Sequence, residues 1–354
     1  MKSNGHRTVK IKGIDGIIDF SLERYKLGGD FFSLTEQFLT GHESSVVKDW
    51  ILHEIHYKSY HQVSADIETV TGERLYSANQ INKKIKIYAK EATQELIKQY
   101  AGTQLNIPFS ESSIGIYEES TTEIHLFDDA IGVKKQKNKR VSGYEKQQKT
   151  VQTDVIEVQN KKGEFEYITA GVGIKQWDIE TALLCWFSLN YGNCILPVVA
   201  ITDGAKTIRL RLWSIFGGQI IIILDWYHLN KKVRELMSMI CFGKIQKQEQ
   251  LSILMPLLWE GKVKDAITKL KQIKPRNTIK QEELIDYLTK HETEIIDYKR
   301  RKEAGKTIGS GRAEKGVDLV VAQRQKNKPI AWSFDGSHAL STLKAQLINQ
   351  KIAA

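Results

Sequence analysis

Two aspartates each close a short apolar run in the middle of the chain. Asp203 follows the run 197–202, and Asp225 follows the run 219–224. Uninterrupted β-branched runs of this length are typical of parallel strands buried on both faces, and open α/β sheets place ligands at the carboxyl ends of such strands. A carboxylate that leaves a buried strand into the Gly204 turn is matched chemically by a divalent cation. N-capping of the following helix explains Asp203 equally well.

The surrounding pattern predicts an α/β sheet. Apolar side chains recur at helical spacing between the two runs, and a Gly-Gly pair ends that helix. Earlier in the chain the alternation predicts three strands joined by hairpins, and a helix follows them at 179–191. The three strands are expected at 123–133, 154–159 and 165–170. This order of elements is that of a ribonuclease-H-like mixed sheet.

The composition favours a polyanionic partner. The chain has 354 residues, of which 41% are hydrophobic, and a net charge of +10. Its pI is near 9.2, which favours nucleic acid or an acidic membrane face. No apolar run reaches the roughly 20 residues of a membrane span, and the N-terminus lacks the apolar core of a signal peptide. Cys185, Cys194 and Cys241 form no CxxC pair, so we expect a reducing cytoplasm and neither a disulfide framework nor structural zinc.

The N-terminal third predicts a β-hairpin and a pair of helices. Residues 7–32 alternate around an Asp-Gly turn, as a hairpin does. Residues 59–92 resemble a helix-turn-helix, in which the first helix ends at Gly72 and Ser77 caps the second. A purely structural helix pair fits the same pattern. The second helix carries the lysines expected to contact DNA phosphates, Lys83, Lys84, Lys86 and Lys90.

Basic and helical segments occupy the rest of the chain. Residues 134–140 form a basic run, expected to be a loop that touches DNA. Residues 230–306 are rich in Lys and Glu and predict a helical segment. Its expected helices are 249–261, 263–273 and 281–298. A Gly-Ser-Gly turn then begins at Gly309, and we expect a helix from Arg312 to about Gln325 and a last amphipathic helix after it.

Four segments carry a resemblance to a known family. They read TDGAKTIR, LDWYHLNKKV, IGSGRAEKGVDLVVAQRQK and AWSFDGSHAL. In this order and spacing they resemble bacterial insertion-sequence transposases of the DDE type, in the group related to Mutator-like transposases. The resemblance implies three catalytic, metal-binding acids, which here are Asp129, Asp203 and Glu314. It also implies a supporting role near the scissile phosphate for His228, three residues after Asp225.

The resemblance covers roughly 115–350 and suggests the domain organisation. We expect a DNA-binding region at 1–110, a catalytic ribonuclease-H-like domain at 111–229 and 307–354, and a helical insertion at 230–306. The implied activity is cleavage and transfer of DNA strands at insertion-sequence ends, with two Mg²⁺ or Mn²⁺ ions. The implied partners are double-stranded transposon and target DNA, bound by a homodimer or larger oligomer at the cytoplasmic nucleoid. Rival hypotheses are a catalytically inactive DNA-binding derivative and a structure-selective nuclease.

The first acid has three candidates. The motif reads DDAIGVK, so alanine stands where the family usually has glycine, and Asp128 competes with Asp129. Alignment of IGVK with the family's I-x-V-K favours Asp129. Asp154 is the third candidate, because it stands in an expected strand before a β-branched residue. The cysteine pairs that family members often carry near the N-terminus are missing here.

The other site residues have structural alternatives. Glu314 suits the first turn of a helix through the helix dipole, and His228 suits packing of a helix on the sheet. Trp332 is expected either to stack on an unpaired base or to belong to the core. The remaining residues expected to contact DNA are Lys134, Arg140, Arg324 and Lys326.

Overall fold

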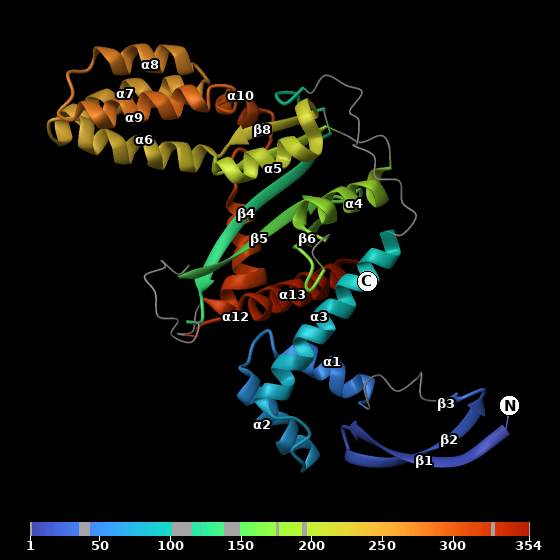
Figure 1. Ribbon diagram of the computed structural model, residues 1–354. Helices are drawn as coiled ribbons and strands as arrows, with labels where there is room; N and C mark the ends of the chain where they lie inside the picture. The colour runs from blue at the N-terminus through green and yellow to red at the C-terminus, as the bar shows by residue number, and fades with distance from the viewer. Residues whose placement is uncertain are drawn as a thin grey trace.

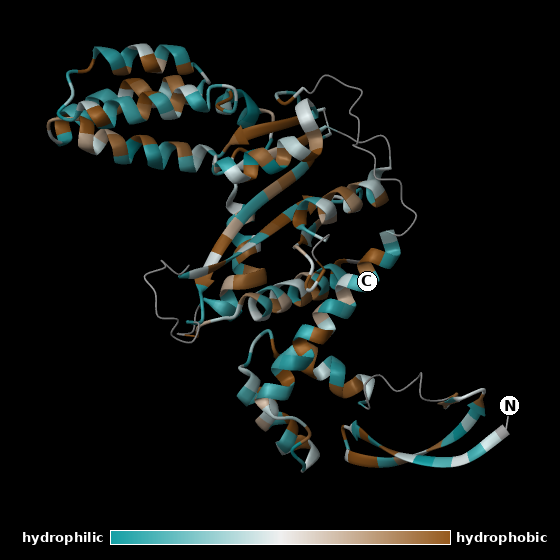
Figure 2. Ribbon diagram, in the orientation of Figure 1, coloured by the Kyte–Doolittle hydropathy of each residue, from teal (hydrophilic) through white to brown (hydrophobic). Residues whose placement is uncertain are grey.

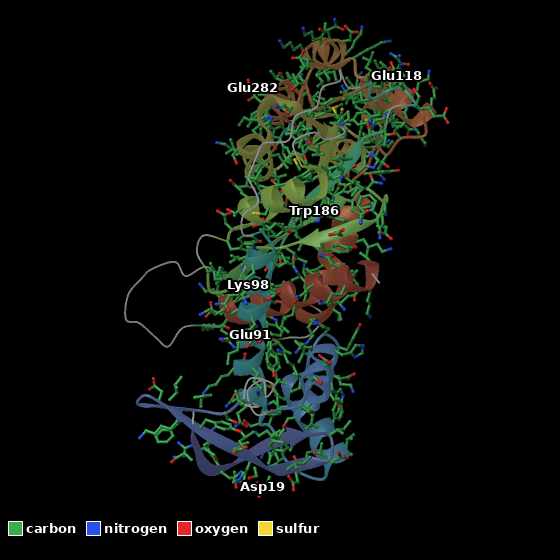
Figure 3. The ribbon with its side chains drawn as sticks, turned by 90° about the vertical axis from the view of Figure 1, so that its right-hand side faces the viewer. Asp19, Glu91, Lys98, Glu118, Trp186 and Glu282 are labelled. Atoms are coloured by element: carbon green, nitrogen blue, oxygen red, sulfur yellow. The ribbon has the colours of Figure 1, made fainter. Side chains whose placement is uncertain are left out.

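The computed structural model describes residues 2–34, 43–100, 115–120, 122–137, 149–174, 177–192, 197–326 and 330–353. They form a mixed α/β structure with one three-stranded and one five-stranded sheet. Asp19 of the small sheet and Glu282 of the helical insertion lie toward opposite ends of the molecule (Figure 3). Among the described residues, no helix is both long and apolar enough to cross a membrane.

The five-stranded sheet has the order β6-β5-β4-β7-β8 (Figure 1). The pairs β6–β5 and β5–β4 are antiparallel, whereas β4–β7 and β7–β8 are parallel. All five strands were expected from the sequence, and their positions are confirmed to within a few residues. Their bounds are Ile124–Lys134 for β4, Thr150–Gln159 for β5, Phe165–Ile168 for β6, Val198–Thr202 for β7 and Ile220–Leu224 for β8.

Both faces of this sheet are covered, as the continuous apolar runs predict. Helices α4 (Ile179–Tyr191) and α5 (Lys206–Phe216) pack on one face, with Leu126, Ala200 and Ile222 among the strand residues beneath them. Phe127, Ile201 and Ile223 belong to the core on the opposite face, together with the helical insertion. Every residue of β7 is therefore buried, and β8 is apolar along its length, whereas β4 and β5 also carry polar residues (Figure 2).

The helical insertion forms a layered bundle beyond β8 (Figure 1). Its helices are α6 (Trp226–Ile240), α7 (Lys244–Trp259), α8 (Val263–Gln272), α9 (Thr278–Lys290) and α10 (Tyr298–Glu303). The expected helix 281–298 is wrong at its carboxyl end, because α9 stops at Lys290. A turn follows, in which buried His291 pairs with Glu294, and Asp297 accepts from the Arg300 amide to cap α10.

The C-terminal helices lie on the same face of the sheet as the helical insertion. They are near the ends of β4 and β5 that are farther from the insertion. The expected helix 312–325 is confirmed as a continuous segment with a π-helical turn in its middle. It consists of α11 (Gly311–Val317), the π turn Asp318–Ala322 and α12 (Gln323–Gln325). The last helix is α13 (Phe334–Ala353), which packs along the N-terminal helix α3.

The N-terminal elements agree with the sequence pattern. The hairpin is formed by β1 (Lys2–Gly13) and β2 (Gly16–Leu27), with β3 (Asp30–Phe32) beside β2. Helices α1 (Ser45–Glu54), α2 (Tyr60–Thr71) and α3 (Ala78–Tyr100) follow. Ser59 and Gln62 form a reciprocal capping box at the start of α2, and Gly72 ends it with φ +70°. Ser77 and Gln80 exchange the same two bonds before α3, which runs eight residues beyond its expected end.

The N-terminal helices share a hydrophobic core with the rest of the chain. Their buried residues contact Val133 and Val151, at the ends of β4 and β5, and Leu340 of α13. This core therefore joins α1–α3 to the far end of the large sheet from the helical insertion. The division into three domains stays a prediction.

Candidate active site

Three aspartates form a row across three neighbouring strands: Asp129 lies within β4, Asp203 directly follows β7 and Asp225 directly follows β8. Parallel pairing places Leu126 of β4 opposite Ala200 of β7. The same register, carried three residues further, sets Asp129 opposite Asp203. The register of β7 with β8 likewise sets Asp203 opposite Asp225. The strands thus bring together carboxylates that are up to 96 positions apart in the sequence, counting from 129 to 225.

Asp203 is exposed at the turn between β7 and α5. Its Oδ1 accepts a 2.8 Å hydrogen bond from the amide of Ala205. Ala205 is itself the residue that precedes α5, and no side chain caps that helix. N-capping of α5 therefore does not explain Asp203.

The turn that carries Asp203 packs against the helical insertion. Gly204 has φ +85°, and a Cβ on it would lie 2.8 Å from Cε1 of His291. His291 is buried and its Nδ1 lies 2.5 Å from Glu294 Oε2. Glu294 Oε1 in turn lies 3.0 Å from Nε of Arg209, on α5. The position of Asp203 therefore depends on a close contact between the sheet and the turn that ends α9.

Asp225 joins the second aspartate motif to the Gly-Ser-Gly turn. Its Oδ1 accepts from the Tyr227 amide at 2.6 Å, and its Oδ2 accepts from the Ser310 amide at 2.9 Å and from the Ser310 hydroxyl. Nδ1 of His228 lies 3.0 Å from Oδ2. Burial alone would raise the pKa of Asp225, but the hydrogen bonds from Ser310, His228 and Tyr227 outweigh it and hold that pKa below its usual range. Asp225 is therefore a buried anchor for the start of α6.

Glu314 reaches the row of aspartates from α11. The anchored Ser310 directly precedes this helix, and Glu314 lies in its first turn with an exposed side chain. Glu314 Oε1 lies 3.9 Å from Nε2 of His228, whose other ring nitrogen faces Asp225. The His228 ring therefore lies between a buried carboxylate and an exposed one.

Asp129 shares one electrostatic environment with the other acids. Burial is the main cause that raises the pKa of Asp129, and the negative charges of Asp203 and Glu314 raise it further. The Ala130 amide, 2.7 Å from Oδ1 of Asp129, and His228 oppose this rise. A carboxylate whose pKa is raised by burial and by neighbouring negative charges, as that of Asp129 is, favours a bound cation.

The two other candidates for the first acid are already neutralised. Both oxygens of Asp128 accept from Nη1 of Arg211 at 3.1 Å, and Asp154 accepts from Nη2 at 2.9 Å. Asp128 is buried, and burial raises its pKa to about 7, although the Arg211 guanidinium opposes that rise. Asp129, in contrast, forms no ion pair within the described part of the chain. Of the three candidates, Asp129 alone has a carboxylate without a cationic partner in the described residues.

The chemistry of Asp129, Asp203 and Glu314 fits a hard divalent cation, because all three offer carboxylate oxygens. Within the described ranges, however, no group of three His, Cys, Asp or Glu side chains stands close enough to hold a metal ion. Oδ1 of Asp129 instead accepts from the Ala130 amide, and Oδ1 of Asp203 accepts from the Ala205 amide. A metal ion held through these Oδ1 atoms would compete with the two amide donors.

The lysines expected to contact DNA from α3 have different surroundings. Lys83 and Lys90 are exposed, and Lys86 is half-buried. The DNA contact expected of Lys84 stays a prediction, although the Nζ atom of this residue lies 2.9 Å from buried Glu43. Its charge is already neutralised within the N-terminal region.

Two C-terminal residues expected to contact DNA are buried in the structure. Trp332 is buried and its Nε1 donates to the main-chain oxygen of Gln325 at 3.0 Å, so it belongs to the core. Arg324 is buried over the Trp332 ring, and its Nε donates to the main-chain oxygen of Ile55 at 2.7 Å. Lys134 and Lys326 are exposed. Arg140 lies outside the described residues.

Sequence reasoning missed several residues that build the site. Arg211 is the residue that the sequence could have revealed most easily. It occupies a core position of α5 together with Ile208, Leu212 and Ile215. A cation in such an apolar stripe predicts a buried acidic partner. His291 and Glu294 gave no comparable signal, because their contacts with the sheet are distant in sequence.

Comparisons with known proteins leave the family of this chain unassigned. No protein-family model matches the chain, and no curated protein matches it either. Among solved structures, the Drosophila P element transposase strand transfer complex is similar over 87% of both chains, with 13% sequence identity and a TM-score of 0.22. A TM-score this low carries no argument for a shared fold or function, so the function has to be inferred from the geometry of the site.

Proposed function

We propose that this chain is a DDE-type transposase, which cleaves DNA at the ends of an insertion sequence and joins the freed strands to target DNA. One observation carries the proposal. Asp129 lies on β4 and Asp203 directly after its parallel neighbour β7, where the strand register, extended beyond its last pair Leu126–Ala200, sets them opposite each other, and the charges of Asp203 and Glu314 raise the pKa of Asp129. Three of the four sequence segments that resemble this family contain Asp203, Asp225 and Glu314, one acid in each.

The sheet supports a ribonuclease-H-like core. Three consecutive antiparallel strands are followed by two parallel strands, which lie on the other side of β4. This arrangement puts the first strand, β4, in the centre beside β7. Asp129, within β4, and Asp203, directly after β7, therefore lie on neighbouring parallel strands.

The carboxylates of Asp129, Asp203 and Glu314 would hold two Mg²⁺ or Mn²⁺ ions. Such ions activate the attacking oxygen and stabilise the leaving oxygen during phosphodiester cleavage. In their absence Asp129 is destabilised by burial and by like charges, and a divalent cation relieves that repulsion. Asp225 orients His228 through Nδ1, which leaves Nε2 to donate to a non-bridging phosphate oxygen beside Glu314. The net charge of +10 and the exposed Lys83 and Lys90 support DNA as the substrate.

The experiment uses the full-length protein, Mg²⁺ and a linear duplex that carries the DNA flanking the coding sequence on both sides, where the proposal predicts inverted repeats. Cleaved and joined products are separated on a gel. We expect Asp203→Asn and Glu314→Gln each to abolish both products, while the exposed variant Asp335→Asn serves as a matched control with wild-type yield. Near wild-type cleavage by Asp203→Asn would contradict the proposal.

The same gel separates the two alternatives. Cleavage without joining identifies a nuclease on the same fold. Binding of the duplex without either product identifies an inactive DNA-binding derivative. The exposed acids Asp203 and Glu314 are both retained, which disfavours the inactive derivative.

A further inference from the structure

Helix α6 carries two faces with different charge. Lys232 lies on the face toward α9, where its Nζ is 2.9 Å from Glu283, and Glu283 also lies 2.6 Å from Nζ of Lys280. Lys231 and Arg234 lie on another face and are exposed. Neither forms an ion pair with a carboxylate in the described ranges. Their positive charges are therefore available to a partner outside the chain.

These cations border a groove between α6 and α7. Two adjoining hollows, of about 430 and 560 Å³, share Arg234 and Lys247 in their walls and so form one groove. Nζ of Lys247 donates to Oγ of Ser238 at 2.6 Å and spans the two helices. Four cations line this α6–α7 groove, Lys231, Arg234, Lys244 and Lys247, against the single acid Glu235. The excess of positive charge matches a polyanion.

The α6–α7 groove begins at the candidate active site. Tyr227 lines its first hollow and is 65% exposed. The Tyr227 amide donates to Asp225, and a Cβ on Gly309 would lie 2.8 Å from the Tyr227 ring. Tyr227 therefore contacts both motifs that position His228 and Glu314, and it is also the first residue of the groove.

The length of the groove sets the extent of a bound ligand. From Tyr227 to Ser238 the helix rises about 16 Å at 1.5 Å per residue. Duplex DNA rises about 3.4 Å per base pair, so this length corresponds to about five base pairs. An acidic peptide would match the charge as well. Binding of a peptide does not require the groove to lead to the row of carboxylates, whereas binding of a DNA substrate does.

We propose that the α6–α7 groove binds the phosphate backbone of duplex DNA over about five base pairs beside the bond that is cleaved. The inference rests on the proposed function, because it takes the row of carboxylates as the cleavage site. It adds a substrate-binding surface on the helical insertion, with Lys231, Arg234, Lys244 and Lys247 as phosphate contacts.

The test is the salt dependence of binding to a 30-base-pair fluorescent duplex of arbitrary sequence, measured with the full-length protein. Each phosphate contact contributes about 0.9 to the slope of log affinity against log salt concentration. We expect Lys231→Ala/Arg234→Ala to lower the magnitude of that slope by about two. The matched control is Lys269→Ala/Lys271→Ala, which removes two exposed lysines from α8, outside the groove, and should leave the slope unchanged.

Each outcome decides one of the two claims. If the wild type binds the duplex and the groove variant keeps its slope, or if the control loses as much, the groove proposal is overturned and the proposed function stands. If the wild type does not bind duplex DNA at low salt, the proposed function fails as well. Tighter wild-type binding to polyglutamate of equal charge than to the duplex would assign the groove to an acidic protein instead. All four substituted residues are exposed, so a thermal melt should show that both variants fold as the wild type does.

Discussion

Asp128 and Asp129 are neighbours in the chain, yet they belong to two regions of opposite character. Successive residues of a strand point to opposite faces, so Asp128 enters the side of the sheet where Arg211 lies, and Asp129 enters the side of Asp203 and Glu314. Asp128, Asp154 and Arg211 form a neutralised structural cluster. Asp129, Asp203 and Glu314 form an acidic cluster whose charges repel one another. Residue type alone therefore does not distinguish a structural carboxylate from a functional one. The charge of the neighbouring side chains distinguishes them.

The largest expected effect comes from removing the cation of the structural cluster. Arg211→Leu leaves Asp128 buried without a counter-charge, and breaking a buried ion pair costs about 3–5 kcal/mol. We expect the free energy of unfolding, measured by urea at pH 8, to fall by that amount. Because burial raises the pKa of Asp128 to about 7, the loss should shrink as the pH is lowered through 7 and Asp128 takes up a proton. A loss of less than about 1 kcal/mol at pH 8 would show that this cluster does not stabilise the fold.

A second buried ion pair sharpens the comparison through its pH dependence. Burial alone would raise the pKa of Glu123, but hydrogen bonds from His125 and Arg301 outweigh it and lower that pKa to about 2. A lowered pKa stabilises the fold above the unfolded value of about 4.3, and this stabilisation is lost as the pH falls toward 2. Glu123→Gln should therefore cost about 3 kcal/mol at pH 7, from 1.36 kcal/mol per pKa unit. The difference from the wild type should shrink between pH 5 and 2, and a pH-independent difference would contradict this origin.

The third prediction concerns the turn that positions the acidic cluster. Gly204→Ala places a Cβ against His291 and requires a strained φ, which costs about 1–3 kcal/mol. Because Asp203 moves with this turn, we expect DNA cleavage to fall more than DNA binding. Gly217→Ala is the matched control, since Gly217 has φ +57° but open space around its Cβ position. Equal losses of cleavage in both variants would show that backbone strain alone, without the His291 contact, is responsible.

The smallest effect is expected at the edge of the structural cluster. Asp154 is partly exposed, and Arg211 keeps Asp128 as its partner when Asp154 is replaced. Asp154→Asn should therefore change the free energy of unfolding by less than about 1 kcal/mol and leave cleavage near wild type. A complete loss of cleavage would instead transfer the role of the first acid from Asp129 to Asp154.

The local pattern of the sequence predicts most of the fold. The strands of the large sheet, the hairpin and α4 follow from alternation, apolar runs and turn residues that act over a few positions. The end of α9 could not be predicted in this way. The apolar pattern continues beyond Lys290, but in the folded chain His291 packs against Gly204 and Glu294 pairs with Arg209. Local patterns contain no information about such distant contacts.

The candidate site could be predicted only in part, for the same reason. Asp203, Asp225 and Glu314 stand in motifs, whereas the sequence only favours Asp129 over Asp128, and the contact of Asp128 with Arg211 in the folded chain separates the two. The sequence also did not reveal where a distant group pairs with a basic side chain expected to contact DNA, as Glu43 does with Lys84. A basic residue in the sequence therefore predicts a charge but not its exposure.

Binding of Mn²⁺ to the full-length protein, measured by calorimetry at pH 7.5 without DNA, tests most directly whether Asp129, Asp203 and Glu314 form a metal site. We expect the wild type and Asp154→Asn to bind with similar affinity. Asp203→Asn should weaken binding by more than about 100-fold, since even groups that only support a metal ligand contribute 10- to 100-fold. Unchanged affinity in Asp203→Asn, or an equal loss in Asp154→Asn, would contradict the assignment of the acidic cluster as the catalytic centre.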